Sequence, residues 1–197
     1  MPLPTATRCD TLPGVIAAER SSCLIVTGMP GAGKSTVTRR VAERLPRSAR
    51  LDGDQISRLV VSGRVGALGK PADEAARQLE LCNRNLCMLA NNFSDAGFTP
   101  VIDWVIPDRR QLDFFVGLLS ARQVLFVVLA PGIEVCRYRN TLRAPHERFS
   151  FDGYDRLDAD MKRELGDAGW WFDTADLAPD ETADRLLCEA RHRAPVN

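Results

Sequence analysis

A nine-residue stretch of this chain carries the residue types that bind phosphate. It combines glycines with a lysine and two hydroxyl side chains: Gly28, Met29, Pro30, Gly31, Ala32, Gly33, Lys34, Ser35 and Thr36. Glycine adopts backbone angles that other residues resist, so successive N–H groups can turn inward around phosphate oxygens. The Lys34 ammonium can reach β- and γ-phosphates, and the Ser35 hydroxyl can ligate Mg²⁺. The spacing Gly-x-x-x-x-Gly-Lys-Ser is that of a P-loop, which predicts that Gly28 and Pro30 to Thr36 bind a nucleoside triphosphate.

The elements on both sides of this stretch fit that interpretation. The apolar, β-branched run from Cys23 to Thr27 predicts a buried strand before the loop, and Thr36 to Leu45 has the periodicity of a helix. A strand that leads through a glycine-rich loop into a helix is the context that a P-loop requires. A chance lysine in a glycine turn would not come with both neighbours.

The rest of the chain alternates between strand and helix patterns. Strands are predicted after the first one at 49–54, 99–104, 124–129 and 170–173, and the longest helix at 72–96. This alternation predicts an α/β fold of the P-loop NTPase type, with five parallel strands and helices on both faces of the sheet. Residues 1–21 carry three prolines and little periodicity, which indicates a flexible N-terminal arm before a single domain at 22–192.

Composition excludes several classes of function. The 26 basic and 26 acidic residues cancel, so no overall charge would attract nucleic acid or an anionic membrane. Six cysteines occur without a C-x-x-C pair, which favours reduced thiols over zinc ligands or disulfides. The sequence shows neither a membrane-spanning run nor a signal-peptide core. We therefore expect a cytoplasmic protein with no nucleic-acid or membrane partner.

The P-loop followed by Leu51-Asp52-Gly53-Asp54 resembles the small P-loop kinases. These include chloramphenicol phosphotransferase, gluconate kinase, adenylylsulfate kinase and shikimate kinase. The run from Val101 to Ile106 is similar to the third strand of the chloramphenicol phosphotransferase group. The resemblance implies a sheet ordered 2-3-1-4-5, ATP with Mg²⁺ as the phosphate donor, and a small molecule with a hydroxyl group as the acceptor. No N-K-x-D sequence, typical of GTPases, is present.

That strand order gives the carboxylates distinct expected roles. Asp103, at the end of the third strand, would approach Mg²⁺ directly or through water, so that Ser35 and Asp103 are the expected metal residues. A buried structural carboxylate is the alternative for Asp103. By the resemblance, Asp54 would contact the acceptor hydroxyl as a base or orienting group, and it could also cap the helix that follows. The role of Asp52 stays open.

Arginines on a closing lid would stabilise the transferring phosphate, because phosphoryl transfer depends mainly on positioning and charge neutralisation. The candidates are Arg137, Arg139, Arg143 and Arg148, and we expect Arg139 or Arg143 to contact phosphate. The segment from Asp173 to Pro179 resembles the one that lies under the nucleotide base in these kinases.

The sequence says less about the acceptor than about the nucleotide site. An anionic acceptor would need its own arginines, for which the candidates are Arg58, Arg64, Arg84, Arg109 and Arg110. A neutral acceptor would instead use apolar residues such as Leu68, Trp104 and Val105. The sequence therefore predicts an ATP-dependent phosphotransferase acting on a small metabolite or antibiotic. The alternatives are a nucleoside or nucleotide kinase, or a nucleotide-binding regulator or toxin-type module without kinase activity.

Overall fold

The protein is described by a computed structural model, which covers residues 22–121, 123–145, 148 and 150–197. The proposed arm at 1–21 lies outside these residues. Five strands form the sheet: β1 (Ser22–Gly28), β2 (Ser48–Asp52), β3 (Thr99–Asp103), β4 (Gln123–Leu129) and β5 (Trp170–Phe172). All pair in parallel in the order β2-β3-β1-β4-β5, which confirms the predicted order. β1 and β4 are almost fully buried, as expected for strands covered on both faces.

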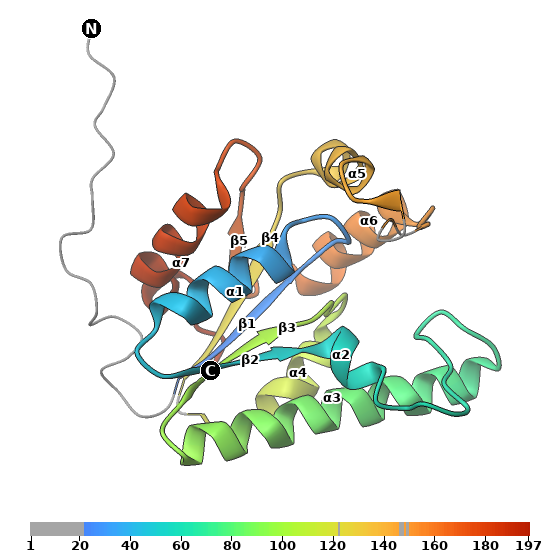
Figure 1. Cartoon of the computed structure of the whole chain (residues 1–197), viewed down its shortest axis with the longest axis horizontal. Coiled ribbons are helices and arrows are strands. Elements are labelled where there is room, and N and C mark those ends of the chain that lie inside the picture. Colours follow the sequence, from blue (N-terminus) through green and yellow to red (C-terminus); the bar gives the residue numbers. More distant parts are fainter. Residues whose placement is uncertain (1–21, 122, 146–147, 149) are drawn as a thin grey trace, which may run out of the picture.

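Seven helices connect and cover the strands in the described part of the chain. They are α1 (Lys34–Arg44), α2 (Gly53–Ser57), α3 (Ala72–Asp95), α4 (Arg109–Leu118), α5 (Ile133–Thr141), α6 (Tyr154–Leu165) and α7 (Pro179–Arg193). α1 packs against α7 on one face of the sheet, and α3 packs with α4 on the other (Figure 1). The apolar stripe of α3 buries Cys82, Leu86 and Ala90 against the strands. None of these helices is long and apolar enough to cross a membrane.

The last described residues complete the sheet where β5 stops. β5 pairs only with Val127, Val128 and Leu129 of β4. Further down the same strand, Phe126 donates from its backbone N–H to Ala194, and Val196 donates to Val124. This second contact is antiparallel, with Leu125 opposite Pro195. One side of β4 is therefore paired along its length by two separate segments.

Candidate active site

The P-loop joins β1 to α1 at the end of the sheet where the strands finish. Gly31 lies at φ +85°, and a side chain there would place its Cβ 2.4 Å from the backbone oxygen of Cys136 on α5. Only glycine fits this conformation and this close approach. Gly33, at φ +100°, precedes the first residue of α1. The amide groups of the loop and of the first turn of α1 thus form the phosphate cradle that the sequence predicts.

Lys34 is half-buried at the mouth of this loop. Its ammonium donates to the backbone oxygens of Gly28 at 2.9 Å and Met29 at 3.1 Å. Burial lowers the pKa of Lys34 from its ordinary value, while the negative charges of Asp103 and Asp54 act in the opposite direction. A poorly hydrated cation held between carboxylates would interact strongly with the oxygens of a bound phosphate.

A cavity of about 540 Å³ opens beside the loop. Seven of the predicted residues lie in its wall: Gly31, Ala32, Gly33, Ser35, Thr36, Arg139 and Arg143. Ser35 and Thr36 are exposed at the first turn of α1. Thr174, Leu177 and Pro179 of the 173–179 segment also line this cavity, and so does Thr182 of α7. The role of this segment under a nucleotide base stays a prediction. Gly28 and Pro30 belong to the loop but not to the wall of this cavity.

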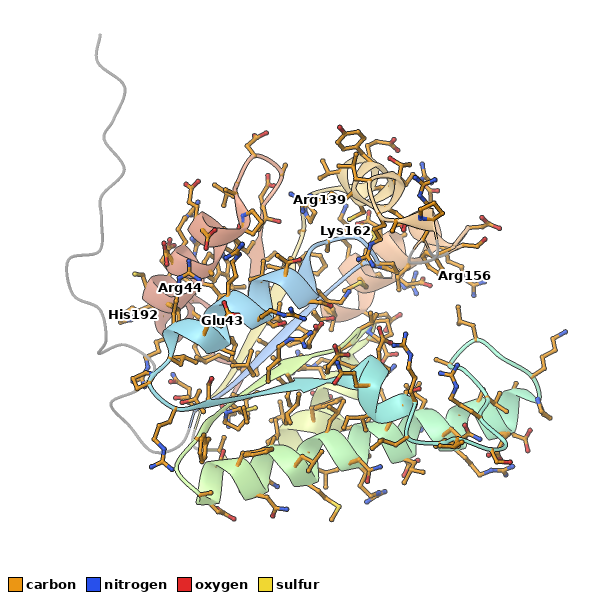
Figure 2. All side chains as sticks on the ribbon, in the orientation of Figure 1. Glu43, Arg44, Arg139, Arg156, Lys162 and His192 are labelled. Carbon is orange, nitrogen blue, oxygen red and sulfur yellow. The ribbon has the colours of Figure 1, made fainter. Side chains whose placement is uncertain are left out.

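Arg139 connects the two walls. Its guanidinium donates to the backbone oxygen of Ala32 in the P-loop at 3.1 Å and to that of Thr174 at 3.0 Å. In Figure 2, Arg139 lies between α5 and the loop before α7. Arg143 lowers the pKa of Lys34 through its like charge, so it lies within electrostatic range of the ammonium. Of the remaining lid candidates, Arg137 pairs with Glu134 and Asp155, and Arg148 donates to the Arg143 backbone.

Thr174 provides independent support for a ligand in this cavity. Its side chain is 2% exposed, and its hydroxyl oxygen has no hydrogen-bond partner among the described residues. A buried hydroxyl without a partner is unusual in a folded protein. Since Thr174 is among the residues that line the cavity, we expect its hydroxyl to turn toward a polar group of a bound nucleotide. The unpartnered hydroxyl and the glycine loop are both compatible with a nucleotide in this site.

Arg50, a residue that the sequence analysis did not single out, binds the carboxylates of Asp52 and Asp103. One of its nitrogens, Nη2, donates to Asp103 at 2.5 Å and to Asp52 at 3.0 Å. Its Nε donates to the hydroxyl of Thr38 on α1 at 2.8 Å, and this hydroxyl also contacts Asp103. Asp103 is 4% exposed, so a partner of opposite charge is essential there.

Asp52 and Asp54 differ in role within the same short segment. The Asp52 side chain accepts from the backbone N–H groups of Asp54 and Gln55, and so caps α2. The capping role that was the alternative for Asp54 is therefore filled by Asp52. Asp54 is exposed in the first turn of α2. Its negative charge raises the pKa of Cys82 and opposes the lowering of the Lys34 pKa. The preceding residue, Gly53, accepts a hydrogen bond from the Cys82 thiol on α3 at 3.5 Å through its backbone oxygen.

The residues available for Mg²⁺ are Ser35 and Asp103, both near Lys34. Within the described ranges, no group of three or more His, Cys, Asp or Glu side chains forms a metal cage. Ser35 is exposed at the head of α1, and Asp103 supplies a carboxylate. The roles of both residues in metal binding stay predictions.

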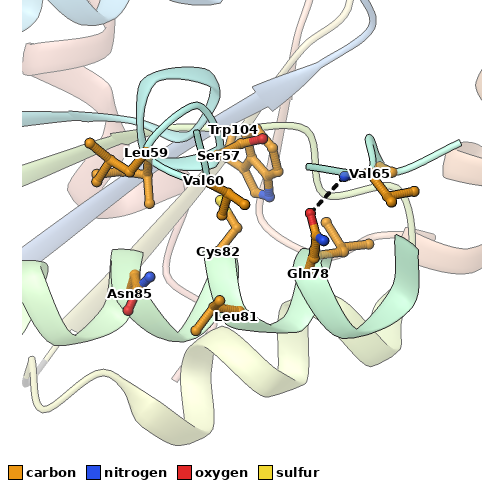
Figure 3. A pocket seen from close by; sticks show the side chains of 12 residues that line it. Ser57, Leu59, Val60, Val65, Gln78, Leu81, Cys82, Asn85 and Trp104 are labelled. Carbon is orange, nitrogen blue, oxygen red and sulfur yellow. Dashed lines mark hydrogen bonds between the residues drawn. The ribbon is translucent and has the colours of Figure 1, made fainter. Parts of the chain in front are cut away.

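A second cavity, of about 140 Å³, lies between α2, the 58–71 segment and α3 (Figure 3). Trp104, the residue after β3, forms one wall. Its indole nitrogen donates to Asn83 at 2.8 Å, and its ring lies so close to Gly53 that a Cβ there would be 2.0 Å away. Gln78 closes the other end by accepting from the Val65 backbone at 2.8 Å.

The sheet order and the phosphate cradle at the head of α1 define a P-loop NTPase fold of the kinase-like type. The chain belongs to the AAA domain family AAA_33, whose pattern matches residues 24–165. A comparison with curated proteins found no match.

Three solved structures show how far the similarity of fold extends, and each of them is less than 20% identical to this chain in sequence. A sugar kinase from Janibacter sp. HTCC2649 matches with a TM-score of 0.67 at 18% identity, covering 85% of this chain and 93% of its own. A tunicamycin resistance protein from Deinococcus radiodurans matches with a TM-score of 0.61 at 18% identity, covering 90% and 99%. Shikimate kinase from Acinetobacter baumannii matches with a TM-score of 0.58 at 19% identity, covering 85% and 90%. At such identities the similarity establishes the fold.

Proposed function

We propose that this protein is an ATP-dependent phosphotransferase that moves the γ-phosphate of ATP to a hydroxyl group of a small metabolite or antibiotic. The observation that carries the proposal is the position of Asp54 in the first turn of α2, directly after Gly53. The Gly53 backbone oxygen accepts from the thiol of Cys82, which lines the second cavity, and the charge of Asp54 also acts on Lys34 at the P-loop. A carboxylate between a nucleotide site and a small-molecule cavity is suited to orient an acceptor hydroxyl.

The proposed reaction is a single in-line displacement. The acceptor oxygen forms a bond to the γ-phosphorus as the bond from that phosphorus to the β–γ bridging oxygen breaks, and ADP leaves. The Asp54 carboxylate accepts the proton of the acceptor hydroxyl and later releases it to water. A loose transition state needs little deprotonation, so Asp54 would act as much by orienting the hydroxyl as by removing its proton.

The other residues would stabilise charge in this step. Lys34, Arg143 and the P-loop amides would neutralise the phosphate oxygens, and Arg139 would hold the P-loop against the Thr174 wall. Ser35 and Asp103 would hold Mg²⁺, which when bound supplies further charge neutralisation on the phosphates.

The fold supports the proposal, because proteins described as a sugar kinase and a shikimate kinase share it. Among the described residues, five cysteines are free and four of them are buried, which supports a location in the reducing cytoplasm.

The test is acceptor-dependent consumption of ATP. The purified protein is incubated with ATP, Mg²⁺ and a protein-free metabolite extract, and phosphorylated products are identified by mass spectrometry. A kinase should form ADP much faster with the extract than without it, and Lys34→Ala should abolish the difference. Slow ATP hydrolysis that no extract fraction stimulates would instead indicate a nucleotide-binding regulator or toxin-type module. A product that proves to be a nucleotide would indicate the nucleoside or nucleotide kinase alternative.

A further inference from the structure

We propose that the cavity between α2, the 58–71 segment and α3 selects an uncharged acceptor whose apolar part is about one six-membered ring in size. This inference rests on the proposed function, since it concerns the acceptor of that reaction. The residues of the cavity wall are Ile56, Ser57, Leu59, Val60, Val65, Ala67, Gln78, Leu79, Leu81, Cys82, Asn85 and Trp104.

The chemistry of this wall favours a neutral ligand. No lysine, arginine, histidine or carboxylate is among the lining residues. Gln78 is engaged, because its amide bonds the backbones of Val65 and Gly63 and the Glu74 side chain. Within the described ranges, Ser57 and Asn85 line the cavity without a hydrogen-bond partner of their own. The wall therefore offers apolar contact and two groups that can bind a hydroxyl, ether or carbonyl oxygen.

The arginines that an anionic acceptor would require do not face this cavity. Arg84 pairs with Glu80 and lies over the Phe114 ring, and Arg109 pairs with Asp113. The remaining candidates, Arg58, Arg64 and Arg110, are exposed and do not contribute to the wall. An ionised carboxylate or phosphate in the cavity would lose its hydration without gaining an opposite charge. The negative charge of Asp54 beside Cys82 would repel it further.

The size of the cavity limits the apolar part of the ligand. A protein cavity of about 150 Å³ lined by apolar side chains admits one benzene molecule, and this cavity measures about 140 Å³. Trp104 is fixed by its bond to Asn83 and by its contact with Gly53, so the wall that it forms is pre-organised. In Figure 3 the labelled side chains from α3, Gln78, Leu81, Cys82 and Asn85, face the loop residues Leu59, Val60 and Val65. A ring between these two sides could direct its hydroxyl toward Asp54.

Two probes of the same size, one neutral and one anionic, test this inference. 4-(Hydroxymethyl)benzamide, a neutral alcohol, and 4-(hydroxymethyl)benzoate are compared by ligand-observed NMR on the full-length protein, and each is then tested as an acceptor with ATP and Mg²⁺. We expect the neutral alcohol to bind at least about ten-fold more tightly than the carboxylate. In the variant Leu81→Arg, which adds a cation to the wall, this preference should reverse or disappear.

Met88→Arg is the matched control. Leu81 and Met88 are 47% and 58% exposed and lie seven residues apart on α3, so both lie on the same side of the helix, but Met88 is outside the cavity. Equal or tighter binding of the carboxylate to the unmodified protein would overturn the inference, and so would the failure of both probes to bind. If the alcohol binds with the expected selectivity but neither it nor any extract fraction stimulates ATP consumption, the selectivity of the cavity for a neutral ligand is confirmed, while its role as an acceptor site and the proposed function are wrong.

Discussion

Arg50 and Asp103 form an ion pair in which both side chains are largely shielded from water, with exposed fractions of 15% and 4%. The pair joins neighbouring strands just before the P-loop end of the sheet. It also connects to Asp52, which caps α2, and to Thr38 on α1. One guanidinium thus ties together the segment that carries Asp54 and the helix that begins at Lys34.

Arg50→Met should destabilise the protein, because it leaves the Asp103 carboxylate buried without a counter-charge. Removing one partner of a buried pair typically costs about 3–5 kcal/mol. In a double-mutant cycle with Asp103→Asn, measured by urea unfolding, the double variant should lose less stability than the sum of the two single changes. Additive losses would contradict a direct coupling between the two side chains.

Lys34→Ala should lower phosphoryl transfer by about 10²-fold or more without unfolding the protein. Among the described residues, the ammonium bonds only the Gly28 and Met29 backbone oxygens, so its loss removes charge stabilisation in the transition state rather than packing of the core. Initial rates and thermal unfolding followed by circular dichroism measure the two effects separately. Turnover close to that of the unmodified protein would contradict the proposed function.

Asp54→Asn and Asp103→Asn should separate acceptor activation from metal binding. Asp54→Asn should leave the affinity for ATP and Mg²⁺ nearly unchanged while acceptor phosphorylation falls. Loss of a general base typically costs 10²–10⁴-fold, and a loose transition state would reduce the loss. Asp103→Asn should raise the Mg²⁺ concentration needed for half-maximal rate. If Asp103→Asn loses turnover at saturating Mg²⁺ while Asp54→Asn stays active, the two roles are assigned the wrong way round.

Thr174→Val should weaken ATP binding while leaving the free protein as stable as before or more so. The Thr174 hydroxyl is buried without a partner among the described residues, so an isosteric apolar side chain removes an unsatisfied group. One lost hydrogen bond to the ligand corresponds to about 0.5–1.5 kcal/mol, or roughly two- to twelve-fold in affinity. Isothermal titration calorimetry with ATP and thermal unfolding test both parts. Unchanged ATP affinity would place the hydroxyl outside the nucleotide site.

Buried thiols should limit stability at alkaline pH. Burial raises the pKa of Cys82 from 9.0 to about 11 and that of Cys87 to about 12. Both pKa values exceed that of an exposed thiol, so the folded protein holds these protons more tightly than the unfolded chain does. The resulting stabilisation of the folded state is complete below pH 9 and is lost as the pH rises through 11 and 12. The free energy of unfolding should fall above pH 9 by up to about 1.4 kcal/mol per pH unit for each thiol. Cys87→Ala should reduce this slope, whereas Cys188→Ala, at a partly exposed position, should not.

The parts of the site that are local in sequence could be predicted. Strand, glycine loop, lysine and helix follow one another directly, so the P-loop and its cavity wall were recognisable from spacing alone. The strand order followed from the resemblance to a known family. The cap of α4 is local in the same way, because the Asp108 side chain and the Gln111 N–H from which it accepts are only three residues apart.

The parts that depend on distant contacts could not be predicted. Arg50 meets Thr38 and Asp103, which are 12 and 53 residues away, only because the register of β2 and β3 aligns Asp52 with Asp103. Between Asp52 and Asp54, either residue could have capped α2, and only the backbone angles of the segment select Asp52. The orphaned hydroxyl of Thr174 likewise has no sequence signal, because it is defined by the absence of a partner in space.

The two-part pairing of β4 has a consequence for the behaviour of the protein at high concentration. A sheet edge with a long row of unpaired N–H and C=O groups recruits strands from other molecules, which leads to aggregation. Here β5 occupies one half of that side of β4, and residues 194–197 occupy the other half in the opposite direction. Because β5 runs parallel to β4 and the C-terminal segment runs antiparallel to it, a strand from another molecule finds no continuous row of free N–H and C=O groups on this side of β4. Substitutions that detach residues 194–197, such as Ala194→Asp at a fully buried position, should therefore promote self-association as well as unfolding.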